Sequence, residues 1–335
     1  MSHTSPEQVR PPVAQGRRRR RSITLTRRDK LVATLLVGVP LLLDLAFVWF
    51  PALGSVALSF TKWTGVGSVS FTKHCTKSVI PGLPQKGGCF DGLQNYDRAF
   101  NRYPDFWPAV QHNVIWLVVF MVIATPLGML FAVILDRGIR GSRIYQSVLF
   151  LPVMLSLALI GIVWELVYSQ QYGLINTIIG RNGNDNAIDW LGNPHLNLWS
   201  ILVEAIWRQA GYVMVLYLAG LKAVDPALRE AATIDGATTW QTFWRVIFPV
   251  MKPINIVILV VTVIESLRAF DLVFITGKGN PVHGLELLSV LVTQNIVGET
   301  QQLGFGSALG VVLLVIALVP ITIFLYQTFR REQRS

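Results

Sequence analysis

Residues 230–237 read Glu-Ala-Ala-Thr-Ile-Asp-Gly-Ala and lie between two long apolar stretches of the chain. The segment begins with a polar residue and contains several residues with small side chains. Pro249 follows twelve residues after its end. A polar segment between two membrane spans offers a surface to a partner outside the bilayer. We therefore predict that residues 222–252 form a loop on which another protein acts.

The apolar stretches around this loop predict a membrane protein. Hydrophobic residues make up 52% of the chain and charged residues 14%. Six stretches reach the roughly 20 residues that cross a bilayer as a helix. They are 31–60, 111–135, 144–169, 197–222, 253–276 and 305–329. Backbone groups in lipid must be hydrogen-bonded internally, and none of the stretches alternates like a barrel strand. The predicted fold class is all-α with six transmembrane helices.

Lys and Arg predict the orientation. With the N-terminus in the cytoplasm, cytoplasmic segments hold 19 of the Lys and Arg residues and outer segments hold 8. This is the positive-inside pattern, so both termini are predicted to be cytoplasmic. The net charge of +10 mostly reflects this topology. Arg17–Arg21 accordingly indicates an anchor on anionic membrane lipid rather than a nucleic-acid site.

The predicted regions follow from the spans. They are a disordered basic tail (1–30), a transmembrane domain (31–329) with an outer loop (61–110) and a cytoplasmic loop (222–252), and a second tail (330–335). The outer loop holds both cysteines, Cys75 and Cys89, either as a disulfide or as two unpaired thiols. Two Cys and five scattered His at these spacings predict no metal site. Near the last outer loop, residues 285–297 predict an amphipathic segment on the outer surface.

The cytoplasmic loop is predicted to be a helix–turn–helix elbow. Asp225 before Pro226 is a helix start, and Gly236 after Asp235 is a helix end. A second helix is predicted over 238–247. The small residues at the bend would let a partner approach closely. The alternative is an ordinary amphipathic connector lying on the membrane.

The loop also resembles a known family. Glu-Ala-Ala, three residues, Gly and then Ile-x-Leu-Pro is the pattern of membrane subunits of bacterial ABC importers. Here it stands as Glu230-Ala231-Ala232, Gly236 and Val246-Ile247-Phe248-Pro249. Four further segments resemble the carbohydrate-importing branch of this family. They are residues 92–96, 173–176, 189–191 and 217–221. The chain is therefore similar to a maltose-type permease subunit, although Gly-Gly-x-Pro is altered to Gly277-Lys278-Gly279-Asn280-Pro281.

The resemblance implies the type I ABC importer permease fold in the plasma membrane of a bacterium. It also implies a second permease subunit, two ATPase subunits, an outer solute-binding protein or lipoprotein, and a sugar or oligosaccharide substrate. The ATPase-coupling residues would be Glu230, Ala231, Ala232, Asp235, Gly236 and Pro249. The chain lacks the phosphate-binding Gly-x4-Gly-Lys-Ser/Thr. We therefore expect no enzyme activity and no cofactor in this chain, with ATP and Mg²⁺ bound by the partner ATPase.

Ionisable residues inside predicted spans indicate a substrate path, because charges in a bilayer usually line a cavity or pair. At the helical rise, Glu204 lies at the depth of Arg268, and Arg208 at that of Glu265. Both pairs could close a gate between spans, or they could be static ties. The substrate-path candidates are Glu204, Trp207, Arg208, Tyr212, Glu265, Arg268, Phe270 and Asp271. Each aromatic residue among them could instead be simple packing.

Two other function classes compete with an ATP-driven importer. A secondary transporter driven by an ion gradient would use the intramembrane carboxylates as proton or sodium sites. A membrane scaffold without transport activity would show no substrate-dependent ATPase in any complex.

Overall fold

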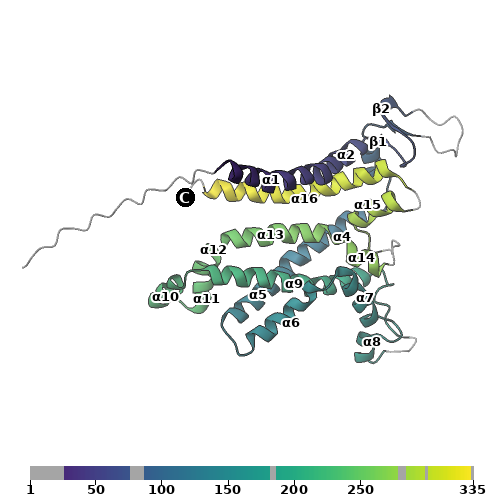
Figure 1. Cartoon of the computed structure of the whole chain (residues 1–335). Helices are drawn as coiled ribbons and strands as arrows, with labels where there is room; N and C mark the ends of the chain where they lie inside the picture. Colours follow the sequence, from purple (N-terminus) through teal and green to yellow (C-terminus); the bar gives the residue numbers. More distant parts are fainter. Residues whose placement is uncertain (1–25, 76–86, 182–185, 278–283, 299–300, 333–335) are drawn as a thin grey trace, which may run out of the picture. The chain divides into compact units, whose positions relative to one another are not determined.

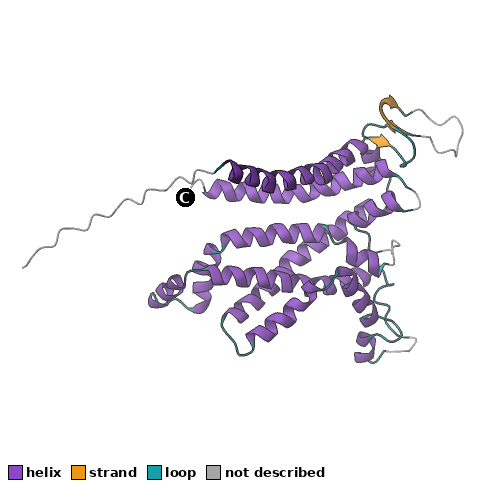
Figure 2. Cartoon of the chain, viewed as in Figure 1, coloured by secondary structure: helices purple, strands orange, loops and turns teal. Residues whose placement is uncertain are grey.

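The computed structural model describes residues 26–75, 87–181, 186–277, 284–298 and 301–332. The chain divides into two compact units with a boundary between Ala52 and Leu53. Helices form most of both units, and the strands of the described chain all lie between residues 61 and 90 (Figure 2).

The first unit is built on one apolar helix. α1 (Arg27–Asp44) continues through the π-helical segment η1 (Leu45–Trp49) into α2 (Phe50–Leu58). The Thr26 hydroxyl accepts a hydrogen bond from the Asp29 N–H, and the Asp29 carboxylate accepts one from the Thr26 N–H, which fixes the helix start. The continuous helix has 32 residues, more than the roughly 20 that cross a bilayer.

Three further helices of the described chain are long and apolar enough to cross a membrane. They are Phe106–Asp136, α9 (Asn197–Ala223) and the first part of α16 (Leu303–Glu332). The helix Phe106–Asp136 consists of α4 (Phe106–Val119), π-helical η2 (Phe120–Ala124) and α5 (Thr125–Asp136).

α9 is the most buried of these helices, with α5 and α6 (Ser142–Met154) beside it (Figure 1). Two glycines permit this close packing. A Cβ on Gly128 of α5 would lie 2.7 Å from the Ala210 carbonyl oxygen, and a Cβ on Gly211 would lie 2.3 Å from the Leu149 carbonyl oxygen. Neither site has room for a side chain, so small residues set the helix separation, as is usual in membrane bundles.

The predicted span 144–169 is divided. α6 and α7 (Leu157–Val167) meet at an angle of 101°. Leu155 and Ser156 between them are extended, and the Ser156 hydroxyl caps α7 by accepting a hydrogen bond from the Leu159 N–H. The local cap stabilises a helix start within an apolar run, which hydropathy does not reveal.

The predicted span 253–276 is divided too. Arg268 and Ala269 separate α13 (Lys252–Leu267) from α14 (Phe270–Thr276). A bend of 76° precedes α13. Before this bend lie α11 (Thr239–Thr242), π-helical η3 (Phe243–Ile247) and α12 (Phe248–Val250). With each bent pair taken as one span, the described chain has six spans, and the predicted all-α membrane fold is confirmed.

The loop after α2 contains a small sheet, although no strand is predicted there from the sequence. Its strands are β1 (Thr61–Lys62), β2 (Val69–His74) and β3 (Gly88–Phe90), in the order β1-β3-β2. β1 is antiparallel to β3, with Thr61 opposite Phe90, and β2 is parallel to β3. The pairing joins the two ends of the loop, so it depends on chain closure rather than on a local pattern.

Short helices complete the second unit. They are α3 (Gln94–Asn101), α8 (Leu174–Ile178), α10 (Pro226–Ile234) and α15 (Leu288–Val297). α15 corrects the expectation of a surface segment at 285–297. Its Leu288 and Leu291 are buried in one cluster with Phe305 and Leu309 of α16.

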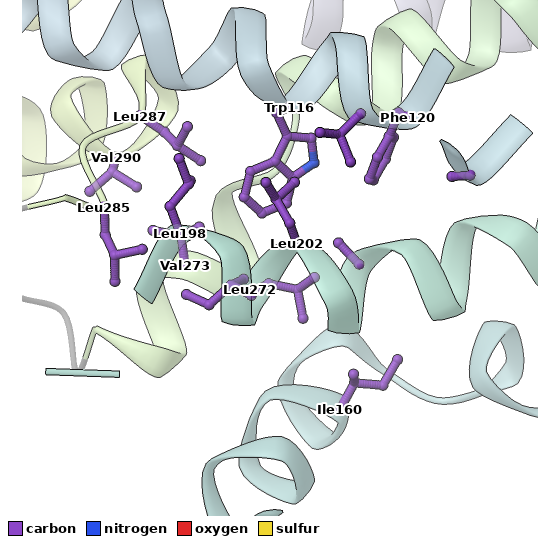
Figure 3. Packing of buried hydrophobic residues seen from close by; sticks show 14 residues of the cluster. Trp116, Phe120, Ile160, Leu198, Leu202, Leu272, Val273, Leu285, Leu287 and Val290 are labelled. Atoms are coloured by element: carbon purple, nitrogen blue, oxygen red, sulfur yellow. The ribbon is translucent and has the colours of Figure 1, made fainter. Parts of the chain in front are cut away.

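The main core lies where α4, α9 and α14 meet (Figure 3). Trp116 of α4 and Leu202 of α9 point toward each other there, and Leu272 comes from α14. A second core cluster around Met214 joins α5, α9 and the start of α13. α9 therefore contributes to both clusters and connects the core to the loop that follows it.

Candidate functional site

The loop 222–252 forms a bent elbow directly after α9. The chain turns at Val224, which is extended, and the Asp225 carboxylate accepts a hydrogen bond of 2.9 Å from the Ala227 N–H. Pro226 occupies the first turn of α10, where a missing N–H costs nothing. The helix start is therefore the one that the Asp-Pro pair predicts.

Gly236 ends α10 for a backbone reason. Its φ is +75°, and the Ala237 N–H donates to the Ala232 carbonyl at 3.0 Å, which closes the helix end. A Cβ at Gly236 would meet nothing within 4 Å. The left-handed conformation, which costs an ordinary residue about 1–2 kcal/mol, therefore favours glycine here.

The bend presents an apolar side chain to its surroundings. Ile234 is 86% exposed, and Glu230, Ala231, Asp235 and Gly236 beside it are exposed as well. The bend therefore presents one large apolar side chain, bordered by charged residues, on its outer side. Two of the predicted coupling residues lie elsewhere. Ala232 is buried within the chain, and Pro249 is exposed in α12 on the second arm of the elbow.

An ion pair that sequence reasoning missed ties the elbow to the membrane helices. Arg229 Nη1 lies 2.8 Å from Asp136 Oδ2 at the end of α5, and Arg229 Nη2 donates to the Leu221 carbonyl of α9 at 3.2 Å. α10 is therefore connected to two spans at once. The only signal in the sequence is an acid that ends one apolar stretch and a base within the loop, 93 positions further along the chain.

One of the two expected intramembrane pairs is present. Arg208 Nη1 of α9 lies 3.3 Å from Glu265 Oε2 of α13. Both residues line a small cavity of about 30 Å³, together with Arg268 and Asp271. These four candidates for the substrate path are therefore brought together between α9, α13 and α14.

The expected Glu204–Arg268 pair is not formed. Glu204 is fully buried, and neither of its carboxylate oxygens has a hydrogen-bond partner among the described residues. Arg268 is exposed at the break between α13 and α14. The depths of Glu204 and Arg268 match only along an unbroken helix, and Arg268 lies in the two-residue break between α13 and α14.

The aromatic candidates do not line this cavity. The Trp207 ring contacts Trp164, with 5.9 Å between centroids, and Phe270 stacks on Phe274 at 4.8 Å. Tyr212 is half-buried on α9. Their positions agree with a packing role more closely than with direct contact to the charged cavity.

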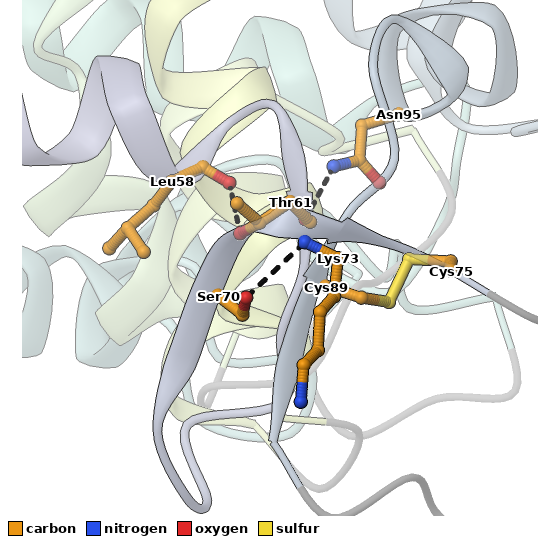
Figure 4. Close-up of a disulfide and its surroundings, with 7 residues drawn as sticks. All are labelled: Leu58, Thr61, Ser70, Lys73, Cys75, Cys89 and Asn95. Carbon is orange, nitrogen blue, oxygen red and sulfur yellow. Dashed lines mark hydrogen bonds between the residues drawn. A yellow bond between two sulfur atoms is a disulfide. The ribbon is translucent and has the colours of Figure 1, made fainter.

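Cys75 and Cys89 are joined by a disulfide with 5.1 Å between their Cα atoms (Figure 4). The bridge connects the residue after β2 to β3. Asn95 of α3 donates hydrogen bonds of 2.9 Å to the carbonyls of Ser59 and Thr61. The small sheet is thereby held both covalently and by a buried amide.

Residues 124–335 match the family described as the binding-protein-dependent transport system inner membrane component. The chain belongs to this family. The permease is 30% identical to the xylose/arabinose import permease protein XacH of Haloferax volcanii over 295 residues, or 88% of this chain and 87% of that one. It is 29% identical to the trehalose/maltose transport system permease protein MalF of Thermococcus litoralis over 289 residues, or 86% and 95%.

The permease also resembles a solved structure. A bacterial ABC transporter involved in the import of the acidic polysaccharide alginate contains a chain that matches with a TM-score of 0.72. The two chains are 20% identical, and the match covers 90% of the permease and 96% of that chain. This likeness concerns the fold, and it confirms the predicted ABC importer permease architecture. The permease is a membrane component of a transporter and not an enzyme.

Proposed function

We propose that this permease carries a sugar or an oligosaccharide across the membrane, coupled to a separate ATPase through the elbow 222–252. The names of the relatives support the substrate class, since they include permeases for xylose and arabinose and for trehalose and maltose. The exposed bend at Ile234 supports the coupling role, because it offers a compact apolar contact on a short, anchored helix.

The proposed assembly contains this chain, a second permease subunit and two ATPase subunits. An outer binding protein delivers the substrate, and the family description, a binding-protein-dependent transport system, supports this part of the proposal. Both termini and the elbow face the cytoplasm of a bacterial cell, in line with the bias of Lys and Arg. ATP and Mg²⁺ bind to the ATPase subunits, and this chain needs no cofactor of its own.

Coupling follows from how the elbow is attached. The ATPase would contact Ile234, Glu230 and Asp235, and its movement would displace α10 as a unit. The Arg229–Asp136 pair and the Arg229–Leu221 hydrogen bond would pass this displacement to α5 and α9. Rigid-body transmission of this kind needs a stiff connection between the two sites.

The translocation path would open between α9 and α13. The charged cavity there holds about 30 Å³, the space of one water molecule, so a sugar requires the helices to separate. Separation breaks the Arg208–Glu265 pair, which makes this pair part of the gate. Glu204, Arg268 and Asp271 would become accessible in the same movement, with Trp207, Tyr212 and Phe270 at the margins.

The family match favours this ATP-driven mechanism over ion-gradient-driven transport. To test it, the chain is tagged and purified from native membranes, and its co-purifying subunits are identified by mass spectrometry. The expected set is an ATPase and a second permease. The purified complex should then hydrolyse ATP faster when the cognate binding protein and one member of a sugar panel are added.

Ile234→Asp is the decisive variant. It should abolish the stimulated ATPase activity and weaken ATPase co-purification, since it places a charge in an apolar contact. Ala227→Asp is the matched control, because it adds the same charge to the first turn of the same helix, where an acid is favourable. The proposal fails if both variants behave alike or if no ATPase accompanies the wild-type chain.

A further inference from the structure

A groove of about 790 Å³ lies between α5 and the second arm of the elbow. One side is formed by α5 from Pro126 to Arg137. The opposite side is formed by Trp240, Phe243 and Trp244. The groove is separate from the charged cavity between α9 and α13, and the transport mechanism above does not use it.

The α5 side of the groove is apolar over a defined length. Leu130 and Ile134 are large, exposed side chains there, and Met129 and Val133 lie beside them. The nine residues from Pro126 to Ile134 extend about 12 Å at the helical rise. One leaflet of a bilayer has a hydrocarbon layer of about 15 Å, half of the whole core.

The end of the groove is basic. Asp136 and Arg229 both line it, but they neutralise each other in the 2.8 Å ion pair. Arg137 remains as an exposed cation that forms no ion pair with the described residues. The groove therefore changes from apolar to positively charged along α5, at the point where the span ends.

Aromatic side chains also line the groove, on the elbow side that faces α5. Trp240 is 71% exposed, and its ring meets the Trp244 ring with 5.5 Å between centroids. Trp244 also contacts Phe248 at 5.0 Å. Tryptophan is enriched where hydrocarbon meets the headgroup layer, because its ring is apolar and its N–H is polar.

We propose that this groove binds an anionic phospholipid, with an acyl chain along α5 and the headgroup phosphate at Arg137. The ligand must be apolar over about the thickness of one leaflet and must carry a negative charge at one end. The anionic phospholipids that surround a groove in the bilayer have both properties. The assignment to the cytoplasmic leaflet rests on the proposed function, which places the elbow in the cytoplasm.

The lipid would contact both α5 and the elbow, the two parts through which the coupling movement passes. Thr233, Ala237 and Thr239 of the elbow line the groove together with α5. A bound lipid therefore fills the space between the elbow and the span that Arg229 and Asp136 connect. Lipid occupancy stabilises one separation of these parts, so the efficiency of coupling depends on the anionic lipid content.

The test uses the tagged full-length chain with all of its co-purifying subunits, in nanodiscs of equal phosphatidylglycerol and phosphatidylcholine. After transfer to mild detergent, retained lipids are counted by native mass spectrometry. The wild-type complex should retain phosphatidylglycerol in preference to phosphatidylcholine. Arg137→Gln should lower that retention by about fivefold, the effect of one cation beside an anionic headgroup. Leu130→Trp, which adds bulk on the α5 side of the groove, should lower the retention of both lipids.

Arg140→Gln is the matched control, since Arg140 is an exposed cation of the same turn that does not line the groove. Equal phosphatidylglycerol retention in Arg137→Gln, Arg140→Gln and wild type overturns the proposal. A photoreactive residue at Leu130 that crosslinks to a protein subunit instead of lipid also overturns it. Subunit composition is scored on the same samples. Loss of the ATPase with lipid retained refutes the proposed function and leaves the lipid site intact.

Discussion

Gly236 shows how one residue position is determined by backbone conformation. The turn requires a positive φ, and no neighbour within 4 Å restricts the side chain. Substitutions there therefore separate backbone strain from bulk. Asparagine tolerates the left-handed region, whereas a β-branched residue does not.

We expect Gly236→Asn to retain most transport and Gly236→Val to lose most of it. The strain of about 1–2 kcal/mol for valine corresponds to roughly a tenfold shift away from the native turn. Binding-protein-stimulated ATPase activity of the purified complex provides the measurement. If valine supports the wild-type rate with the complex intact, the left-handed turn has no role in coupling.

The Arg229–Asp136 ion pair is the second feature at this scale, because it attaches the elbow to the end of α5. Its side chains are partly shielded, at 37% and 15% exposure, so screening by water is incomplete. Removing one partner leaves the other with reduced hydration and no counter-charge, which is worse than removing both.

A double-mutant cycle tests this expectation. Arg229→Met and Asp136→Asn should each lower the thermal stability of the purified complex, and the double variant should be no less stable than the worse single variant. We expect a coupling energy of about 1 kcal/mol, at the upper end for a partly exposed pair. Strictly additive effects would show that the two side chains do not interact in the membrane-embedded protein.

At the scale of elements, α9 and α13 are joined across the bundle by Arg208 and Glu265. Their rotation about the helix axes brings the guanidinium to 3.3 Å from the carboxylate. Glu204 lies one turn away on α9 and finds no partner among the described residues. Besides the apolar cluster around Met214, one ion pair therefore joins these helices and not the two that depth alone suggests.

A charge swap measures the contribution of that pair. Arg208→Glu and Glu265→Arg should each abolish sugar uptake, because each leaves two like charges facing each other in the bilayer. The double variant should recover a substantial part of the uptake. A double variant as inactive as either single one would show that the residues act separately.

Element breaks are the features that hydropathy predicts least well. The break between α6 and α7 depends on Ser156 as a local cap, and the break between α13 and α14 falls at Arg268 and Ala269. Both breaks occur inside apolar runs that contain no glycine or proline at the break itself. Neither break is marked by a strong helix-breaking residue, so a hydropathy average over a window of residues passes across both.

At the scale of the whole molecule, the proposed mechanism makes the permease depend on other subunits for energy. The permease belongs to a family of transport components, and the sequence contains no Gly-x4-Gly-Lys-Ser/Thr motif. An ion gradient therefore should not replace the ATPase, even though carboxylates lie within the spans.

Reconstitution provides the test at this scale. Proteoliposomes with this permease alone should take up no sugar under an imposed proton or sodium gradient. Vesicles with the complete complex, binding protein outside and ATP inside should accumulate it. Gradient-driven accumulation by the single chain would establish the ion-coupled alternative.

The sequence by itself determined the local features. Apolar length specified the six spans, and Asp225-Pro226 with Asp235-Gly236 specified the limits of α10, because helix caps act through neighbouring atoms. Only the tertiary structure decided which distant groups meet. Arg229 with Asp136, Arg208 with Glu265, and the paired strands of the disulfide-linked loop depend on helix rotation and chain closure, which no single segment encodes.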